Sequence, residues 1–199
     1  MSHPHRTASV ERRTKETAIQ ITLDLDGAGA AEIATGVGML DHMLHQLARH
    51  GGLDLSVQAE GDLHVDAHHT SEDVAIALGK ALNEALGDRA GIARFADRTV
   101  PLDEALIQVA LDLSGRPYAV IDLDFPAPMI GELPSSMAKH ILETIAQEGR
   151  LALHVRQLAG ENEHHILEAT FKALARALRD AARVIDDGDA PSTKGTLSS

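Results

Sequence analysis

The chain has 199 residues, of which 44% are hydrophobic and 24% are charged, so it can bury a core of its own. Its net charge of −12 argues against general nucleic-acid binding, because that function needs a basic surface. The chain has no cysteine, which excludes disulfides, iron–sulfur clusters, thiolate zinc sites and a cysteine nucleophile. We expect a cytoplasmic protein without a membrane partner, since the sequence shows neither a signal peptide nor an apolar run of membrane-spanning length.

In the first half of the chain, hydrophobic periodicity predicts alternating strands and helices. Residues 19–27 alternate apolar and polar side chains, which predicts a strand that forms a hairpin with residues 31–36. Residues 38–52 have apolar side chains at helical spacing and end in a Gly-Gly pair, which predicts a helix. Residues 53–66 read as strand, turn and strand. Residues 70–88 predict a helix with acidic residues in its first turn, where they suit the helix dipole.

The second half of the chain repeats this plan. Residues 105–125 predict two strands joined by a Ser-Gly-Arg-Pro turn. Residues 135–149 predict a helix, and residues 150–162 predict a strand and a turn. Residues 164–184 predict a long helix, after which the sequence has no pattern and reads as a tail.

An internal duplication explains this repetition. The motif HHxxE occurs twice at a constant offset of 96 residues, so that His68, His69 and Glu72 correspond to His164, His165 and Glu168. Upstream of the motif the offset is 98, which relates His42 to His140. We therefore expect an α+β protein made of two α/β halves, residues 1–95 and 96–185, followed by a C-terminal tail, residues 186–199.

The two HHxxE motifs indicate metal ligands. On a helix, residues four apart share a face, whereas adjacent residues point about 100° apart, so the two histidines of each motif must serve different partners, and a second metal ion is the economical explanation. The spacing leaves open which histidine serves which ion. Three imidazoles and one carboxylate for each of two ions suit Mn²⁺, Fe²⁺, Co²⁺ or Zn²⁺. The candidate ligands are His42, His68, His69, Glu72, His140, His164, His165 and Glu168. The alternative of surface histidines is disfavoured because both motifs and both upstream histidines are in register.

Several segments, in this order, resemble the imidazoleglycerol-phosphate dehydratase family. They are DHML (41–44), AHHTSED (67–73), SGRPY (114–118), HHILEATFKALARAL (164–178) and PSTKG (191–195). The resemblance covers nearly the whole chain and fits the single-function form. It implies dehydration of a small phosphorylated imidazole, imidazole glycerol phosphate, to imidazole acetol phosphate in histidine biosynthesis. It also implies two Mn²⁺ ions per active site, a 24-subunit particle with active sites between subunits, and helices packed between two mainly four-stranded sheets.

The resemblance also implies roles for residues outside the histidine motifs. Glu16, in RRTKET, matches a substrate-contacting glutamate and is the candidate catalytic acid/base, with a metal-bound water as the alternative. Five residues match positions that bind substrate, chiefly through its phosphate: Arg94, Arg116, Lys172, Ser192 and Lys194. Asp103 and Glu104 are either partners of the ligand histidines or polar residues at the start of a strand. The roles of His45 and His50 stay open.

Two other functions would use the same ligands. A two-metal hydrolase of a phosphorylated metabolite would activate water as its nucleophile. A metal-storage or structural assembly would bind metal without catalysis, but it would leave the basic residues matched to phosphate binding without a role.

Overall fold

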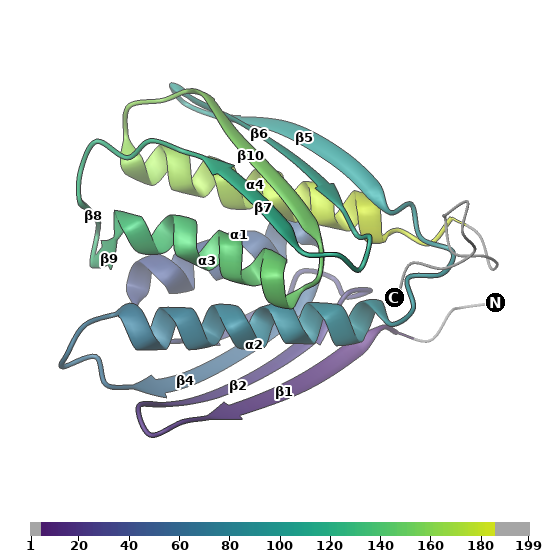
Figure 1. Cartoon of the computed structure of the whole chain (residues 1–199), viewed down its shortest axis with the longest axis horizontal. Coiled ribbons are helices and arrows are strands. Elements are labelled where there is room, and N and C mark those ends of the chain that lie inside the picture. Colours follow the sequence, from purple (N-terminus) through teal and green to yellow (C-terminus); the bar gives the residue numbers. More distant parts are fainter. Residues whose placement is uncertain (1–4, 186–199) are drawn as a thin grey trace.

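The computed structural model describes residues 5–185, which form four helices enclosed by two four-stranded sheets (Figure 1). The first half comprises β1 (Thr7–Arg13), β2 (Thr17–Asp24), β3 (Ala31–Ala34), α1 (Gly38–Gly51), β4 (Asp54–Gly61) and α2 (His68–Leu86). The second half comprises β5 (Phe95–Leu102), β6 (Ala105–Asp112), β7 (Tyr118–Asp122), β8 (Met129–Ile130), β9 (Leu133–Pro134), α3 (Ser135–Glu148), β10 (Ala152–Ala159) and α4 (Glu163–Ala182).

The two sheets share one topology, as a duplication requires. Their strand orders are β1-β2-β4-β3 and β5-β6-β10-β7, and in each the last pair is parallel while the others are antiparallel. The small β8-β9 pair is an addition between β7 and α3. The α+β fold with two repeated halves, predicted from the sequence, is confirmed.

The core lies between the sheets and is built from aliphatic side chains. Strand β2 buries alternate residues such as Ile21, and β6 does the same with Ile107, because successive side chains of a strand point to opposite faces. Phe171, on α4, is the largest fully buried side chain of the described residues. Helix α1 packs on α4 and α2 packs on α3, so each helix pair joins the two halves.

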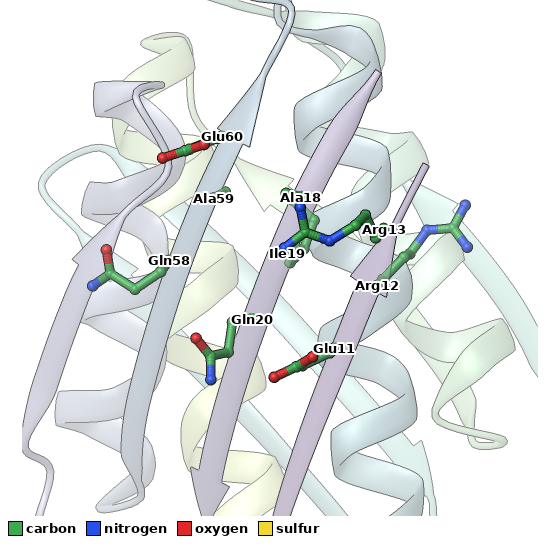
Figure 2. Close-up of a pocket in the computed structure, with 9 residues that line it drawn as sticks. All are labelled: Glu11, Arg12, Arg13, Ala18, Ile19, Gln20, Gln58, Ala59 and Glu60. Atoms are coloured by element: carbon green, nitrogen blue, oxygen red, sulfur yellow. The ribbon is translucent and has the colours of Figure 1, made fainter. Parts of the chain in front are cut away.

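The outer face of the first sheet is polar. Glu11, Gln20, Gln58 and Glu60 point outward from β1, β2 and β4 and line a hollow of about 440 Å³ (Figure 2). The histidine motifs are absent from this face. They lie at the N-terminal ends of α2 and α4, at the left of Figure 1. No helix in the described part of the chain is long and apolar enough to cross a membrane.

Two details of the strand prediction are wrong. Strand β3 does not form a hairpin with β2, because it pairs in parallel with β4, and β2 instead pairs with β1 and β4. Asp54 Oδ1 accepts hydrogen bonds from the amides of Ala28, Gly29 and Ala30, which draws the connecting loop across to β4. The second strand expected within residues 53–66 is a turn.

The helix that follows also starts earlier than expected. Helix α2 begins at His68, so the acidic residues Glu72 and Asp73 lie beyond its first turn. The HH pair is therefore the start of the helix, with its backbone fixed where Asp66 Oδ1 accepts a hydrogen bond from the His68 amide at 2.7 Å. The two strands predicted within residues 105–125 are present, with β10 between them in the sheet.

Candidate metal and acid–base site

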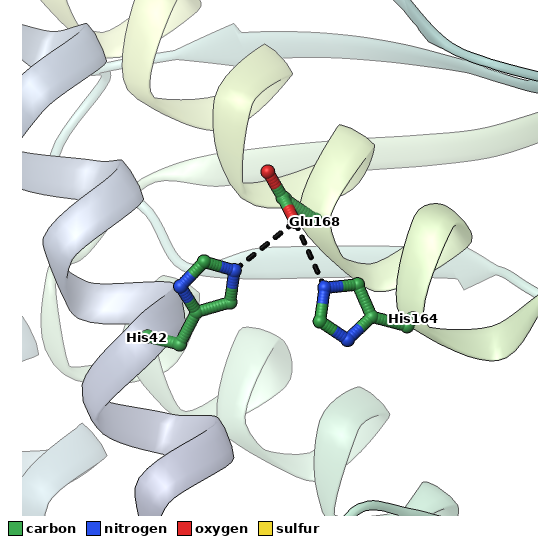
Figure 3. Close-up of side chains that lie close together, drawn as sticks. All are labelled: His42, His164 and Glu168. Atoms are coloured by element: carbon green, nitrogen blue, oxygen red, sulfur yellow. Dashed lines mark hydrogen bonds and ion pairs between the residues drawn. The ribbon is translucent and has the colours of Figure 1, made fainter.

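The first cluster joins helices α1 and α4. His42 Nε2 and His164 Nε2 each lie 3.0 Å from Glu168 Oε2, and the two imidazole rings are 5.3 Å apart (Figure 3). Asn162 caps α4, since its side chain accepts hydrogen bonds from the amides of His164 and His165. The cap starts the helix at Glu163, directly before the histidine pair, and thereby fixes the backbone from which both imidazoles project.

The second cluster joins helices α2 and α3 in the same way. His140 Nε2 lies 2.7 Å from Glu72 Oε1, and the ring of His140 stacks on that of His68 at 5.8 Å. In both clusters one half of the chain supplies a histidine and a glutamate, and the other half supplies the second histidine. The duplication has thus produced two groups of the same composition.

The remaining histidine of each motif points elsewhere. The planes of His68 and His69 are 80° apart, and those of His164 and His165 are 89° apart. His69 Nδ1 lies 3.0 Å from Asp62 Oδ2, and His165 Nδ1 lies 2.7 Å from a Glu104 carboxylate oxygen. A carboxylate that accepts the Nδ1 proton leaves Nε2 as a free ligand atom, as in many metal-binding histidines.

Asp62 was not predicted from the sequence, whereas Glu104 was left open as either a partner of a ligand histidine or a polar residue at the start of a strand, and the structure places it beside His165. Asp62 follows a strand in a turn, where no periodicity marks it. The duplication also relates Glu104 to Glu16. Equivalent residues of the β1-β2 and β5-β6 hairpins are 88 positions apart, so Glu104 occupies the position of Glu16 in the second hairpin. Glu16 is exposed, its carboxylate lies 3.7 Å from His69 Nδ1, and with Asp62 it lines a hollow of about 400 Å³.

Two carboxylates of the site, those of Glu168 and Glu104, have a strongly lowered pKa. Burial by itself would raise the pKa of Glu168, but the Lys172 ammonium, 2.7 Å away, and the imidazoles of His42 and His164 lower it to about 2. The hydrogen bond from His165 is the main cause that lowers the pKa of Glu104 to about 2. Both groups are therefore anionic at neutral pH, as ligands or partners of a cationic site must be.

Two predicted substrate-binding residues, Arg94 and Arg116, lie far from both clusters of the same chain. The Arg94 amide donates to the carbonyl of Ala181, which lies 17 residues after His164 on α4, or about 25 Å along the helix. The Arg94 guanidinium also forms a bidentate ion pair with Asp112, at 2.7 and 3.0 Å. Arg116 lies in the loop after β6, which ends at Asp112, the partner of Arg94. Lys172, by contrast, lies in the first cluster, where it pairs with Glu168.

Ser192 and Lys194, the other two predicted substrate-binding residues, lie outside the described residues.

The donor atoms fit a divalent transition metal. Each cluster offers two imidazole nitrogens and one carboxylate oxygen, all within 4.8 Å of one another. Nitrogen and oxygen donors without sulfur suit Mn²⁺, Fe²⁺, Co²⁺ or Zn²⁺. A third group, Glu16, Asp62 and His69, meets the same distance criterion.

These features define a class of protein: a duplicated α+β chain whose two histidine–carboxylate clusters could each bind a metal ion. The family model for imidazoleglycerol-phosphate dehydratase matches residues 35–178. The chain belongs to this family, and the resemblance drawn from the sequence is confirmed. By family, the chain is therefore a dehydratase, that is, a hydro-lyase.

Relatives and solved structures agree with this assignment. The imidazoleglycerol-phosphate dehydratase of Roseiflexus sp. (strain RS-1) is 57% identical over 194 residues, which is 96% of this chain and 98% of the relative. The chloroplastic enzyme of Pisum sativum is 53% identical and covers 98% of this chain, which spans 71% of that protein. The enzyme from Staphylococcus aureus superimposes with a TM-score of 0.80 at 32% identity, covering 88% of this chain and 97% of that one. The Pyrococcus furiosus enzyme, in complex with (S)-C348, superimposes with a TM-score of 0.81 at 37% identity, covering 94% of this chain and 99% of that one.

Proposed function

We propose that the chain dehydrates imidazole glycerol phosphate to imidazole acetol phosphate, a step of L-histidine biosynthesis in the cytoplasm, and uses two Mn²⁺ ions per active site. The observation that carries the proposal is the pair of clusters of identical composition, in a chain of the dehydratase family. A single histidine–glutamate contact is common on protein surfaces. Two that are related by the duplication, each completed by a histidine from the other half, are not expected by chance.

His42, His164 and Glu168 would hold one ion, and His68, Glu72 and His140 would hold the other. A bound divalent cation lowers the pKa of an imidazole ligand, and it would therefore favour the imidazolate form of the substrate ring. The imidazolate ring would expel the hydroxyl group of the substrate more readily.

Completion of each site would need a neighbouring subunit. Three imidazoles per ion require His69 and His165, and in one chain both are turned away from the clusters. Copies of the chain packed against each other would supply them, with Nε2 kept free by Asp62 and Glu104. The position of Arg94 and Arg116 at the far end of the fold supports the same arrangement. The 24-subunit particle is the assembly that the family resemblance implies.

The remaining roles belong to residues around the metal clusters. Glu16 would move the proton on the substrate carbon, since its exposed carboxylate lies beside His69 at the edge of a hollow. Lys172, Arg94, Arg116, Ser192 and Lys194 would bind the substrate, chiefly through its phosphate. Cations suit a phosphate because charge-assisted hydrogen bonds to it are strong.

Turnover by metal-stripped protein tests the proposal. The substrate is imidazole glycerol phosphate, and the assay is run with and without added Mn²⁺. We expect activity only with the metal, and loss of both activity and Mn²⁺ binding in His42→Ala. His45→Ala is the matched control, because His45 is exposed on the same helix outside the clusters. No turnover by folded, Mn²⁺-loaded protein would refute the dehydratase proposal, and release of inorganic phosphate would favour a hydrolase.

Light scattering of the chelated protein tests the assembly. If metal ions join the subunits, chelation should reduce the particle size. A particle that keeps its full size without metal would contradict this role of the ions.

A further inference from the structure

Hydrogen bonds join the β1-β2 turn, which carries Glu16, to helix α2. Thr14 Oγ1 accepts hydrogen bonds from the amides of Glu16, at 3.1 Å, and Thr17, at 3.0 Å. It also lies 3.1 Å from Thr17 Oγ1. The Thr17 hydroxyl donates to Asp73 Oδ2, and Arg12 Nε donates to Asp73 Oδ1 at 2.7 Å. Asp73 directly follows the HHxxE motif, so the network links the candidate acid/base to the helix of the second cluster.

The partners fix the direction of each hydrogen bond in this network. The Asp73 carboxylate, paired with Arg12, only accepts, so the Thr17 hydroxyl donates to it. Thr17 Oγ1 is then left to accept the Thr14 hydroxyl proton, and Thr14 Oγ1 accepts the two amides. Asp73 is 6% exposed and Thr17 is 4% exposed. In such a low-dielectric place, linked hydrogen bonds strengthen one another, so the turn conformation depends on one carboxylate of α2.

The second half of the chain has no such network. The residues equivalent to Arg12, Thr14, Thr17 and Asp73 are Val100, Leu102, Ala105 and Ala169. All four are apolar and contribute to the core or pack against it.

The two turns also differ in shape. Asp103 and Glu104 form a two-residue turn between the paired Leu102 and Ala105, with Asp103 at a φ of 46°. The β1-β2 turn has the same length, since the Thr14 amide donates to the Thr17 carbonyl at 2.9 Å, but neither of its central residues, Lys15 and Glu16, has a positive φ. The fold itself therefore does not require the network, which occurs only in the half that carries Glu16.

We propose that Asp73, acting through Thr17 and Thr14, is a positioning residue that holds the Glu16 carboxylate beside His69 for proton transfer. The proposal rests on the acid/base role given to Glu16 under the proposed function. The Glu16 side chain is 55% exposed and its ion pair with His69 is long, at 3.7 Å, so its own contacts hold it weakly. The backbone of the turn must then fix its place, and a displacement of about 1 Å can lower a catalytic rate up to roughly a hundredfold.

Thr14→Val and Thr14→Ser form the matched test in the assembled, Mn²⁺-loaded protein. Thr14 is exposed, so neither change disturbs the core, and valine keeps its shape without the hydroxyl. Thr14→Val should lower kcat for imidazole glycerol phosphate by about 10- to 100-fold, with a smaller change in KM and unchanged Mn²⁺ content. Thr14→Ser should keep the wild-type kcat. Amide hydrogen exchange at Glu16 and Thr17 should be faster in Thr14→Val alone.

A second variant carries the residues that the other half of the chain already has, Thr17→Ala together with Asp73→Ala. We expect a folded, Mn²⁺-loaded protein with the same loss of kcat. If Thr14→Val turns over the substrate as fast as the wild type does, the positioning role is overturned and the proposed function stands. An equal loss of kcat in Thr14→Ser would also overturn it, because the hydroxyl is retained there. No turnover by the metal-loaded wild type would overturn the proposed function and, with it, this role.

Discussion

Replacement of Gly61 by alanine should destabilise the fold beside the histidine–carboxylate cluster of α2. Gly61 ends β4, pairs with Thr17 of β2, and directly precedes Asp62, the partner of His69. An added Cβ would lie 2.0 Å from Thr70 Oγ1 and 3.2 Å from Thr70 Cβ. Thr70 is fully buried in the first turn of α2, so the new methyl group would push this end of the helix away from β4.

Two opposing effects set the magnitude of the loss. Alanine in place of glycine restricts the unfolded chain and stabilises the protein by about 0.4–1 kcal/mol where the backbone allows it. Overpacking a well-packed site costs about 1–3 kcal/mol. Because 2.0 Å is far below any real contact, we expect the steric term to win by about 1.5 kcal/mol. For a chain of this length, that lowers the Tm by roughly 3–6 °C.

A double-mutant cycle tests the cause of this loss. Thr70→Ala removes the clashing oxygen, which has no hydrogen-bond partner among the described residues, so the double variant with Gly61→Ala should regain most of the lost Tm. Thr70→Ser keeps Oγ and should give no recovery. Thermal unfolding of the wild type, the three single variants and the two double variants, with Mn²⁺ binding measured in parallel, provides the comparison. An unchanged Tm in Gly61→Ala, or equal recovery with serine and alanine at position 70, would refute the steric reasoning.

Three further predictions concern the cap, the core and pH. Asn162→Ala should lower stability by about 1 kcal/mol and weaken Mn²⁺ binding by releasing the first turn of α4, whereas Asn162→Ser should keep both, as calorimetry and metal titration would show. Phe171→Ala should cost about 3–5 kcal/mol in denaturant unfolding, because the side chain is fully buried. The hydrogen bond from Arg6 holds the pKa of Asp26 below its usual value, so this carboxylate stabilises the fold above about pH 4 and loses that contribution as the pH falls through its folded pKa. Asp26→Asn should therefore lower the Tm at pH 7 and not in strong acid.

The helices and the duplication can be predicted from the sequence because both depend on local, periodic patterns. The apolar stripe of α4 and the HHxxE motif on its first turns can be read directly, and their recurrence in α2 identifies the second half. The register of the helix also separates the two histidines of each pair, and the ring planes agree with that separation. The different directions of the two histidines of each pair, predicted from their spacing on a helix, therefore match the structure, whereas the start of α2 was placed too late.

Strand pairing is harder to predict because partners far apart in the chain determine it. The inner face of the edge strand β1 has only two apolar side chains, Ala8 and Val10, so its hydrophobic signal is weak. The parallel pairing of β3 with β4 cannot be recognised from the sequence of either segment. The place of Asp62 beside His69 depends on the turn after β4. The distance of Arg94 from the clusters follows only from where β5 begins relative to the end of α4.

The way each cluster draws on both halves has a consequence for how such a chain can be divided. His42 lies in the first half and its partners His164 and Glu168 lie in the second, while His140 completes the set begun by His68 and Glu72. A half-length polypeptide would therefore complete neither cluster alone. It would need a second copy, turned about a two-fold axis, and such a pair would contain two identical clusters. When the two copies are joined in one chain, their sequences can diverge. The polar network under Glu16, which is absent from the β5-β6 turn, is one such difference.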